Sequence, residues 1–197
     1  MRRILITSLL LAAMAAIAAI ELPASSAAPT HVNAPTSTRA GQLAAARLAT
    51  AKYATNLDQA KADGYQVITP MIQNMGHHYM NLHVTGFDIR KPPILVYLHH
   101  GSKWQLGALE WVFAKKPAVA PVPGAKYGFF PAACHYTDGT FVPEDSQDAC
   151  AKTSPTSGAK FNFWHGPLVT MHIWLWYPNP AGLYSGTNPL VTPFNNN

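Results

Sequence analysis

Three residues with metal-binding chemistry lie in otherwise apolar segments: His78, Glu110 and His172. Each segment alternates in the way that favours a β-strand. A carboxylate on an apolar strand face must be paired, protonated or bound to a cation, because an isolated buried charge is costly. Two imidazoles and one carboxylate form a ligand set that zinc, copper and iron all accept, with a position left for water or substrate. We therefore expect a divalent metal at these three residues.

Each of the three residues also has a simpler interpretation. A single histidine in a sheet is commonly a core residue hydrogen-bonded to a backbone carbonyl, and Glu110 could pair with a lysine or arginine. The spacing matches no known zinc signature. The metal-site hypothesis therefore depends on whether the sheet brings the three side chains together.

Four further histidines are candidates for the same site: His99, His100, His135 and His165. The first two lie at a predicted turn and are expected to be solvated. The other two lie in or next to a long loop, and either could complete a metal site from there. The sequence does not select between them.

Residues 169–177 predict a central strand whose alternation places His172, Trp174 and Trp176 on one face. Tyr79 and Tyr97, from other predicted strands, are expected to join these tryptophans as the aromatic lining of a pocket. Such a lining suits an apolar ligand or a sugar, and it also suits ordinary core packing.

The motifs of other chemistries are absent from the sequence. It contains no GxSxG nucleophile elbow, no phosphate-binding P-loop and no dinucleotide-binding GxGxxG. Its 14 lysines and arginines are scattered rather than gathered in a stripe, which argues against a nucleic-acid partner. A metal ion or a small molecule is the expected partner, and the oligomeric state stays open.

The helix and strands expected around these residues indicate an α+β fold, in which an N-terminal helix packs on a curved antiparallel sheet. An alanine-rich helix is expected over residues 40–62, and strands over 64–70, 75–82 and 160–177. A turn at 100–103 predicts a hairpin of strands 94–99 and 104–113. Prolines throughout residues 115–157 predict a long irregular loop, which suits a lid or a binding loop. Residues 179–194 are expected to form turns.

Cys134 and Cys150 are the two cysteines of the chain. An even cysteine count in an exported protein favours a disulfide, which here would brace the long loop. Neither cysteine belongs to a CxxC pair, so metal ligation by the thiols is the weaker interpretation.

The N-terminus has the pattern of a secretory signal peptide over residues 1–28. Arg2 and Arg3 precede an uncharged apolar run, and small residues at 26–28 fit a cleavage site. A retained membrane anchor is the alternative, because the run is near the lower length limit for a bilayer span. A polar linker over 29–39 and a single domain over 40–197 follow, and the expected location is secreted or in the cell envelope.

Several motifs together resemble a family of exported bacterial proteins without an established activity. The motifs are Ala60-Lys-Ala-Asp-Gly64-Tyr65, Met75-Gly-His-His78-Tyr79, Leu95-Val-Tyr97, Leu109-Glu110-Trp-Val112, His172-Ile-Trp-Leu-Trp176, Asn179-Pro-Ala-Gly182-Leu and Asn188-Pro189. The resemblance spans most of the mature chain and implies His78, Glu110 and His172 as site members. This chain departs from the family pattern in two places. The Leu-Val-Tyr strand of the pattern ends in Glu, whereas this chain has Leu98 followed by His99 and His100, and the loop that holds the two cysteines is particular to this chain.

Three functions remain open from the sequence. The first is an exported binding protein that holds a metal ion or small ligand in a His/Glu/aromatic pocket. The second is a metal-dependent, hydrolase-like enzyme in which the metal activates water. The third is a structural or protein-interaction module whose three polar residues satisfy one another in the core.

Overall fold

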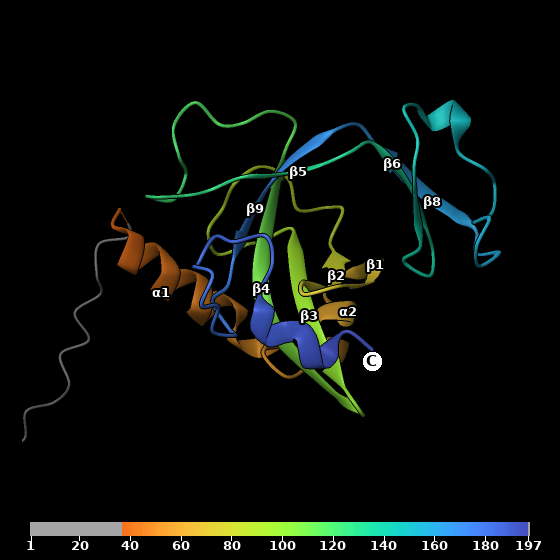
Figure 1. Cartoon of the computed structure of the whole chain (residues 1–197). Helices are drawn as coiled ribbons and strands as arrows, with labels where there is room; N and C mark the ends of the chain where they lie inside the picture. Colours follow the sequence, from red (N-terminus) through yellow and green to blue (C-terminus); the bar gives the residue numbers. More distant parts are fainter. Residues whose placement is uncertain (1–36, 197) are drawn as a thin grey trace, which may run out of the picture. The chain divides into compact units, whose positions relative to one another are not determined.

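The structure is a computed structural model that describes residues 37–196 (Figure 1). The predicted signal peptide and most of the predicted linker lie outside the described residues. Three helical elements come first, namely α1 (Arg39–Thr50), the 3₁₀ turn η1 (Ala51–Tyr53) and α2 (Leu57–Ala62). No helix within residues 37–196 is long and apolar enough to cross a bilayer.

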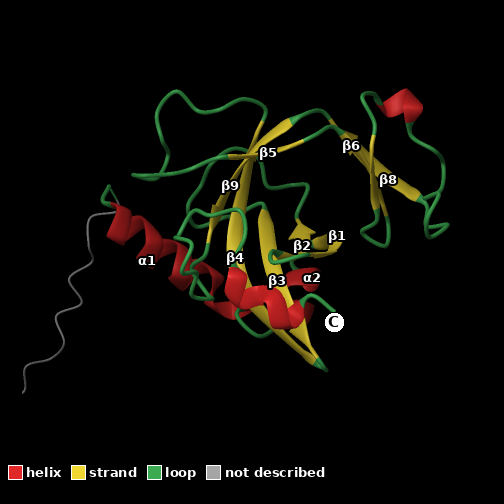
Figure 2. Ribbon diagram, viewed as in Figure 1, coloured by secondary structure: helices red, strands yellow, loops and turns green. Residues whose placement is uncertain are grey.

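The strands form two antiparallel sheets, shown in yellow in Figure 2. The six-stranded sheet has the order β1-β2-β3-β4-β9-β5 and the three-stranded sheet has the order β7-β6-β8. The strands are β1 (Gln66–Ile72), β2 (Gly76–Met80), β3 (Ile94–His100), β4 (Lys103–Phe113), β5 (Gly128–Phe130), β6 (Ala133–Tyr136), β7 (Phe141–Pro143), β8 (Phe161–His165) and β9 (Leu168–Ile173). The 3₁₀ turns η2 (Gln147–Ala149) and η3 (Pro189–Phe194) complete the chain. The predicted α+β class is confirmed.

The N-terminal helix is interrupted, so the prediction of one continuous helix over 40–62 is wrong. Thr38 caps α1, and Asn56 caps α2 by accepting a hydrogen bond from the Gln59 backbone N–H at 3.0 Å. Asparagine favours caps over helix interiors, because its side chain competes for backbone groups. The break also lets the Ala54 carbonyl accept a hydrogen bond from Leu106 of β4 at 2.8 Å. The interruption therefore ties the helical segment to the sheet.

The hairpin of β3 and β4 is confirmed, and these two strands form the middle of the six-stranded sheet. The prediction that residues 169–177 form the central strand is wrong, because β9 lies between β4 and the short edge strand β5 and ends at Ile173. Beyond it, the backbone N–H groups of Trp176 and Tyr177 both donate to the Gly107 carbonyl at 3.1 Å. The chain has therefore left the strand before the second tryptophan.

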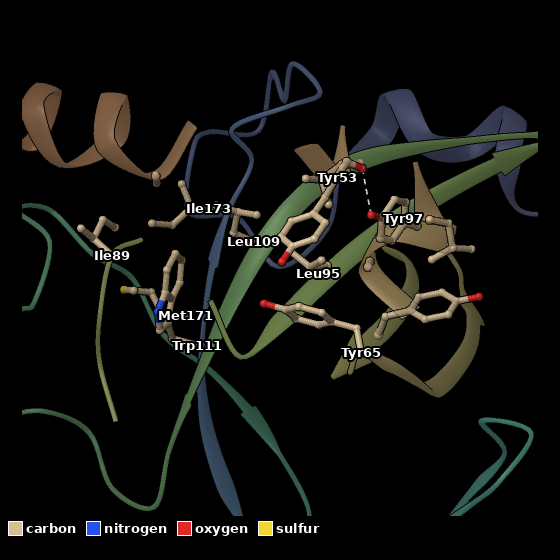
Figure 3. Packing of buried hydrophobic residues seen from close by; sticks show 14 of the residues in the cluster. Tyr53, Tyr65, Ile89, Leu95, Tyr97, Leu109, Trp111, Met171 and Ile173 are labelled. Carbon is tan, nitrogen blue, oxygen red and sulfur yellow. Dashed lines mark hydrogen bonds between the residues drawn. The ribbon is translucent and has the colours of Figure 1, made fainter. Parts of the chain in front are cut away.

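Each face of the six-stranded sheet carries its own apolar cluster. One cluster, called the helix-side cluster below, packs β3, β4 and β9 against the N-terminal helices. Its buried members include Leu95, Tyr97, Leu109, Trp111 and Ile173 (Figure 3). The other cluster lies on the opposite face and includes residues of β3 and β4, together with Val191 of η3. Burial on both faces explains why β3 is apolar almost throughout rather than alternating.

A β-bulge at Gly107 divides β4 into two halves of different phase. Ala108 pairs with Val96 and Leu106 pairs with Tyr97, so the bulged residue has no partner of its own in β3. Leu106 consequently belongs to the helix-side cluster and Ala108 to the opposite one. Regular alternation along residues 104–113 would place Leu106 and Glu110 on one face, and the bulge instead puts them on opposite faces.

The long loop predicted over residues 115–157 contains more structure than expected. It supplies β5 to the main sheet and forms β6, β7 and η2, and β8 completes the second sheet. The predicted disulfide between Cys134 and Cys150 is confirmed, with the two Cα atoms 5.6 Å apart. It joins β6 to the segment that follows η2 and so braces this part of the chain.

Tyr97→Phe is expected to lower the free energy of unfolding by about 1–2 kcal/mol. The Tyr97 hydroxyl donates to the Tyr53 carbonyl at 2.8 Å in the core (Figure 3), and the substitution leaves that buried carbonyl without its partner. Urea denaturation measures the loss. Tyr79→Phe is the matched control, because Tyr79 is buried in the same cluster beside Tyr97 and burial, without a hydrogen bond to a described residue, accounts for the raised pKa of its hydroxyl. An equal loss in both variants would contradict the role assigned to this hydrogen bond.

Candidate metal centre

Three strands of the six-stranded sheet supply the residues of the candidate metal centre. His78 lies on β2, Glu110 on β4 and His172 on β9. Glu110 and His172 are directly opposite each other across β4 and β9, whereas His78 pairs with Val96 of the intervening strand β3. Residues that point to the same side of neighbouring strands lie close enough to interact. The register therefore gathers groups that are 94 positions apart at the extremes of the set, from 78 to 172.

The polar atoms of these side chains converge. Glu110 Oε1 lies 2.9 Å from His172 Nε2, and Glu110 Oε2 lies 3.5 Å from His78 Nε2. One ligand atom from each residue lies within 4.8 Å of the others, and all three residues are buried. The His78/Glu110/His172 group, called the triad below, could therefore hold a metal ion.

The two histidines of the triad differ in what supports their rings. His78 Nδ1 lies 2.8 Å from the Thr69 hydroxyl oxygen, which also accepts a hydrogen bond from the His78 backbone N–H at 3.2 Å. His172 Nδ1 is buried and has no hydrogen-bond partner among the described residues. A histidine that ligates a metal through Nε2 commonly has its Nδ1–H held by a second group. Thr69 supplies that support for His78, and the sequence did not single it out.

The electrostatics of the triad favour the forms that bind a cation. Burial alone raises the pKa of the Glu110 carboxyl, but His172 and His78 outweigh that effect, and the net pKa lies below its ordinary value. Burial lowers the pKa of His78 to about 4, against the opposing pull of Glu110. At neutral pH the triad thus offers a carboxylate and, at His78, an uncharged imidazole. These are the protonation states that metal coordination requires.

The triad lines a cavity of about 420 Å³. Most of the remaining lining is apolar, and it includes Ile68, Ile94, Val112, Phe130, Phe141 and Phe163. Glu110 is the one residue with a formal charge among the described residues of this lining. A mostly apolar chamber with a few convergent polar groups is typical of a small-molecule site.

The aromatic residues expected in the pocket lie elsewhere. Tyr79 and Tyr97 pack in the helix-side cluster, on the face of the sheet opposite the triad. Trp174 is buried next to the triad face and donates from Nε1 to the Ser185 carbonyl at 2.7 Å. Trp176 donates from Nε1 to the Thr50 hydroxyl at 3.0 Å. The cavity takes its aromatic lining mainly from the segment that was expected to be an irregular loop.

The structure also separates the four other candidate histidines. His99 stacks on Trp104 with ring centroids 4.1 Å apart and His100 is exposed, and neither lines the cavity. His135 of β6 and His165 of β8 do line it, together with the triad. The sequence named both as possible site members but could not place them, because their strands are too short to show a clear alternation.

Comparisons with models of known families, with curated proteins and with solved structures give no match for this chain. The resemblance to exported bacterial proteins stays a prediction.

Proposed function

We propose that this chain is an exported binding protein that holds a divalent metal ion at the triad and a small, mainly apolar ligand in the adjoining cavity. The convergence of two imidazoles and one carboxylate from three strands on one buried cavity carries the proposal. The predicted signal peptide supports a location outside the cell or in its envelope.

The simpler interpretation of Glu110 has little support in the geometry. Its ion-pair partners among the described residues are His78 and His172, and no lysine or arginine lies among the described residues that line the cavity. Besides these two imidazoles, the Thr170 side chain forms a hydrogen bond with the carboxylate. The negative charge itself is compensated by positive charge on the rings or by a bound cation. A divalent ion satisfies the carboxylate and both imidazoles at once.

The cavity provides room for a ligand beside the metal. Its volume of about 420 Å³ lies within the range typical of small-molecule sites. Three protein ligands leave at least one coordination position of a typical catalytic or transport metal for an incoming donor atom. The ligand that fits has an apolar body and one oxygen or nitrogen donor.

Metal binding tests the proposal directly. The chain, prepared without a histidine tag, is stripped with a chelator and dialysed against zinc or copper, and its metal content is measured by mass spectrometry. The wild type is expected to hold one equivalent more than His172→Ala. His100→Ala is the matched control, because this exposed histidine lies outside the cavity, and it is expected to match the wild type.

Equal metal content in the wild type and His172→Ala would refute metal binding at the triad, and the triad would then be three polar residues that satisfy one another in the core. Hydrolysis of a generic ester, phosphate or peptide substrate that a chelator abolishes, and that is also lost in His172→Ala, would instead identify the hydrolase-like enzyme.

A further inference from the structure

A second pair of nitrogen atoms meets in the same cavity, away from the triad's own contacts. His135 Nε2 of β6 lies 3.0 Å from His165 Nε2 of β8. His165 pairs with Ala133 and His135 pairs with Phe163, so the two histidines are diagonal neighbours across the strands. Such neighbours are within reach of each other when their side chains are long or aromatic. The antiparallel register of the second sheet therefore holds the contact in place.

The other ring nitrogen of each histidine fixes its protonation. His135 Nδ1 lies 2.7 Å from the Ile68 carbonyl oxygen, and His165 Nδ1 lies 2.6 Å from the Gly166 carbonyl oxygen. A carbonyl oxygen can only accept a hydrogen bond, so both Nδ1 atoms must carry the proton. In the neutral rings, each Nε2 is then an unprotonated acceptor. Two acceptor lone pairs face each other at 3.0 Å, which is favourable only when a cation lies between or beside them.

That cation is either a shared proton or a metal ion. The surroundings disfavour a protonated pair, because His135 stacks on Phe163 with ring centroids 4.6 Å apart and His165 packs against Phe130 at 5.3 Å. Among the described residues that line the cavity, Glu110 is the one carboxylate, and it pairs with His78 and His172 rather than with either of these rings, so it does not offset an imidazolium charge here.

We infer that His135 and His165 form a second metal site in the cavity, suited to a late first-row divalent ion and to copper(II) foremost. Two nitrogens 3.0 Å apart, each about 2.0–2.1 Å from one ion, subtend an angle of roughly 95°. This is the angle of adjacent positions in tetragonal coordination, which copper(II) and nickel(II) prefer. Copper(II) also binds nitrogen ligands most tightly among the divalent ions of this row.

The support behind the ligands strengthens the assignment. Both Nδ1–H groups donate to backbone carbonyls, which is the arrangement that orients ligating histidines and raises their basicity. His172 of the triad lacks such a partner among the described residues. The two remaining in-plane positions of the ion are open to water or to donor atoms of a molecule in the cavity. The inference stands without metal binding at the triad.

Copper binding in a triad-disabled background tests the inference. The full chain carrying His172→Ala is stripped of metal and titrated with copper(II), and the bound ion is followed by electron paramagnetic resonance with detection of the remote imidazole nitrogens. One equivalent with two coupled imidazoles is expected. Adding His165→Asn is expected to weaken this binding at least about 100-fold, because it removes a ligand and not merely an outer-shell partner.

His100→Asn in the same background is the matched control and is expected to leave the affinity unchanged. Any copper site elsewhere in the chain is common to these variants and cancels in the comparison. Unchanged affinity in the His165→Asn variant would overturn the inference. If that variant does not fold, the His172→Ala protein alone decides, and the absence of a two-imidazole signal at one equivalent would overturn it. Failure of the triad proposal is a separate result, namely equal metal content in the wild type and His172→Ala.

Discussion

Replacing Glu110 with glutamine is expected to weaken metal binding at the triad by at least about 100-fold, a loss above the range seen when outer-shell partners are removed. Glutamine keeps the volume of the side chain but removes the negative charge, and Glu110 is the one formally charged residue among the described residues of the cavity lining. A neutral amide oxygen is a poor substitute for a carboxylate as a metal ligand. The dissociation constant is measured by competition with a chromophoric chelator.

Glu144→Gln is the matched control for this loss. It makes the same chemical change on a residue that does not line the cavity, and its affinity is expected to equal that of the wild type. Thermal melting of the metal-free proteins separates lost affinity from lost folding. Wild-type affinity in a folded Glu110→Gln protein would show that the ion does not use this carboxylate.

The three residues of the triad could be found from the sequence because each is a polar exception in an alternating apolar segment. The face of a strand on which a residue lies follows from a local period of two, so it can be predicted without knowing which strands pair. The contact between Glu110 and His172 could not be predicted in the same way. It depends on the pairing of β4 with β9, which are joined by a connection of more than 50 residues.

Two local features make simple alternation predict the wrong face for some residues. The bulge at Gly107 shifts the phase of β4, so the face on which Glu110 lies can be read only from the residues after the bulge. The strand β9 ends at Ile173, so the positions of Trp174 and Trp176 no longer follow from that of His172. Neither the bulge nor the strand end has a strong signal in the sequence.

The position of one expected pocket residue could have been predicted correctly from the same rule. Tyr79 is the immediate neighbour of His78 on β2, and adjacent residues of a regular strand point to opposite faces. It therefore cannot share the triad's cavity, and the structure places it in the helix-side cluster. The expected aromatic lining of the pocket was inferred from composition, although strand alternation already excludes Tyr79 from it.

The second sheet could not be predicted from the periodicity of the sequence. Its strands β6 and β7 have 4 and 3 residues, too few to distinguish a period from chance. The prolines around them correctly predicted the absence of long elements. Short strands can still form a sheet because tertiary packing and the disulfide, rather than local propensity, hold them in register.

Replacing both Cys134 and Cys150 with serine is expected to lower the free energy of unfolding by about 3 kcal/mol. The bond closes a loop with a sequence separation of 16 residues, and its removal gives the unfolded chain more conformations to occupy. This loss is a large part of the total stability of an ordinary domain. Urea denaturation measures it, and addition of a reductant to the wild type is expected to reproduce it.

The double serine variant itself serves as the control for the reductant, which should not destabilise it further. The two proposed metal sites should then respond differently, because Cys134 directly precedes His135 on β6 while the triad lies on the six-stranded sheet. Loss of the disulfide removes a constraint on the strand that carries His135, so copper affinity at the His135/His165 pair should fall while affinity at the triad stays near that of the wild type. Equal weakening at both sites in a folded protein would show that the two sheets do not support their sites separately. An unchanged free energy of unfolding would show that packing of β6 between β7 and β8 is sufficient to hold this region without the covalent link.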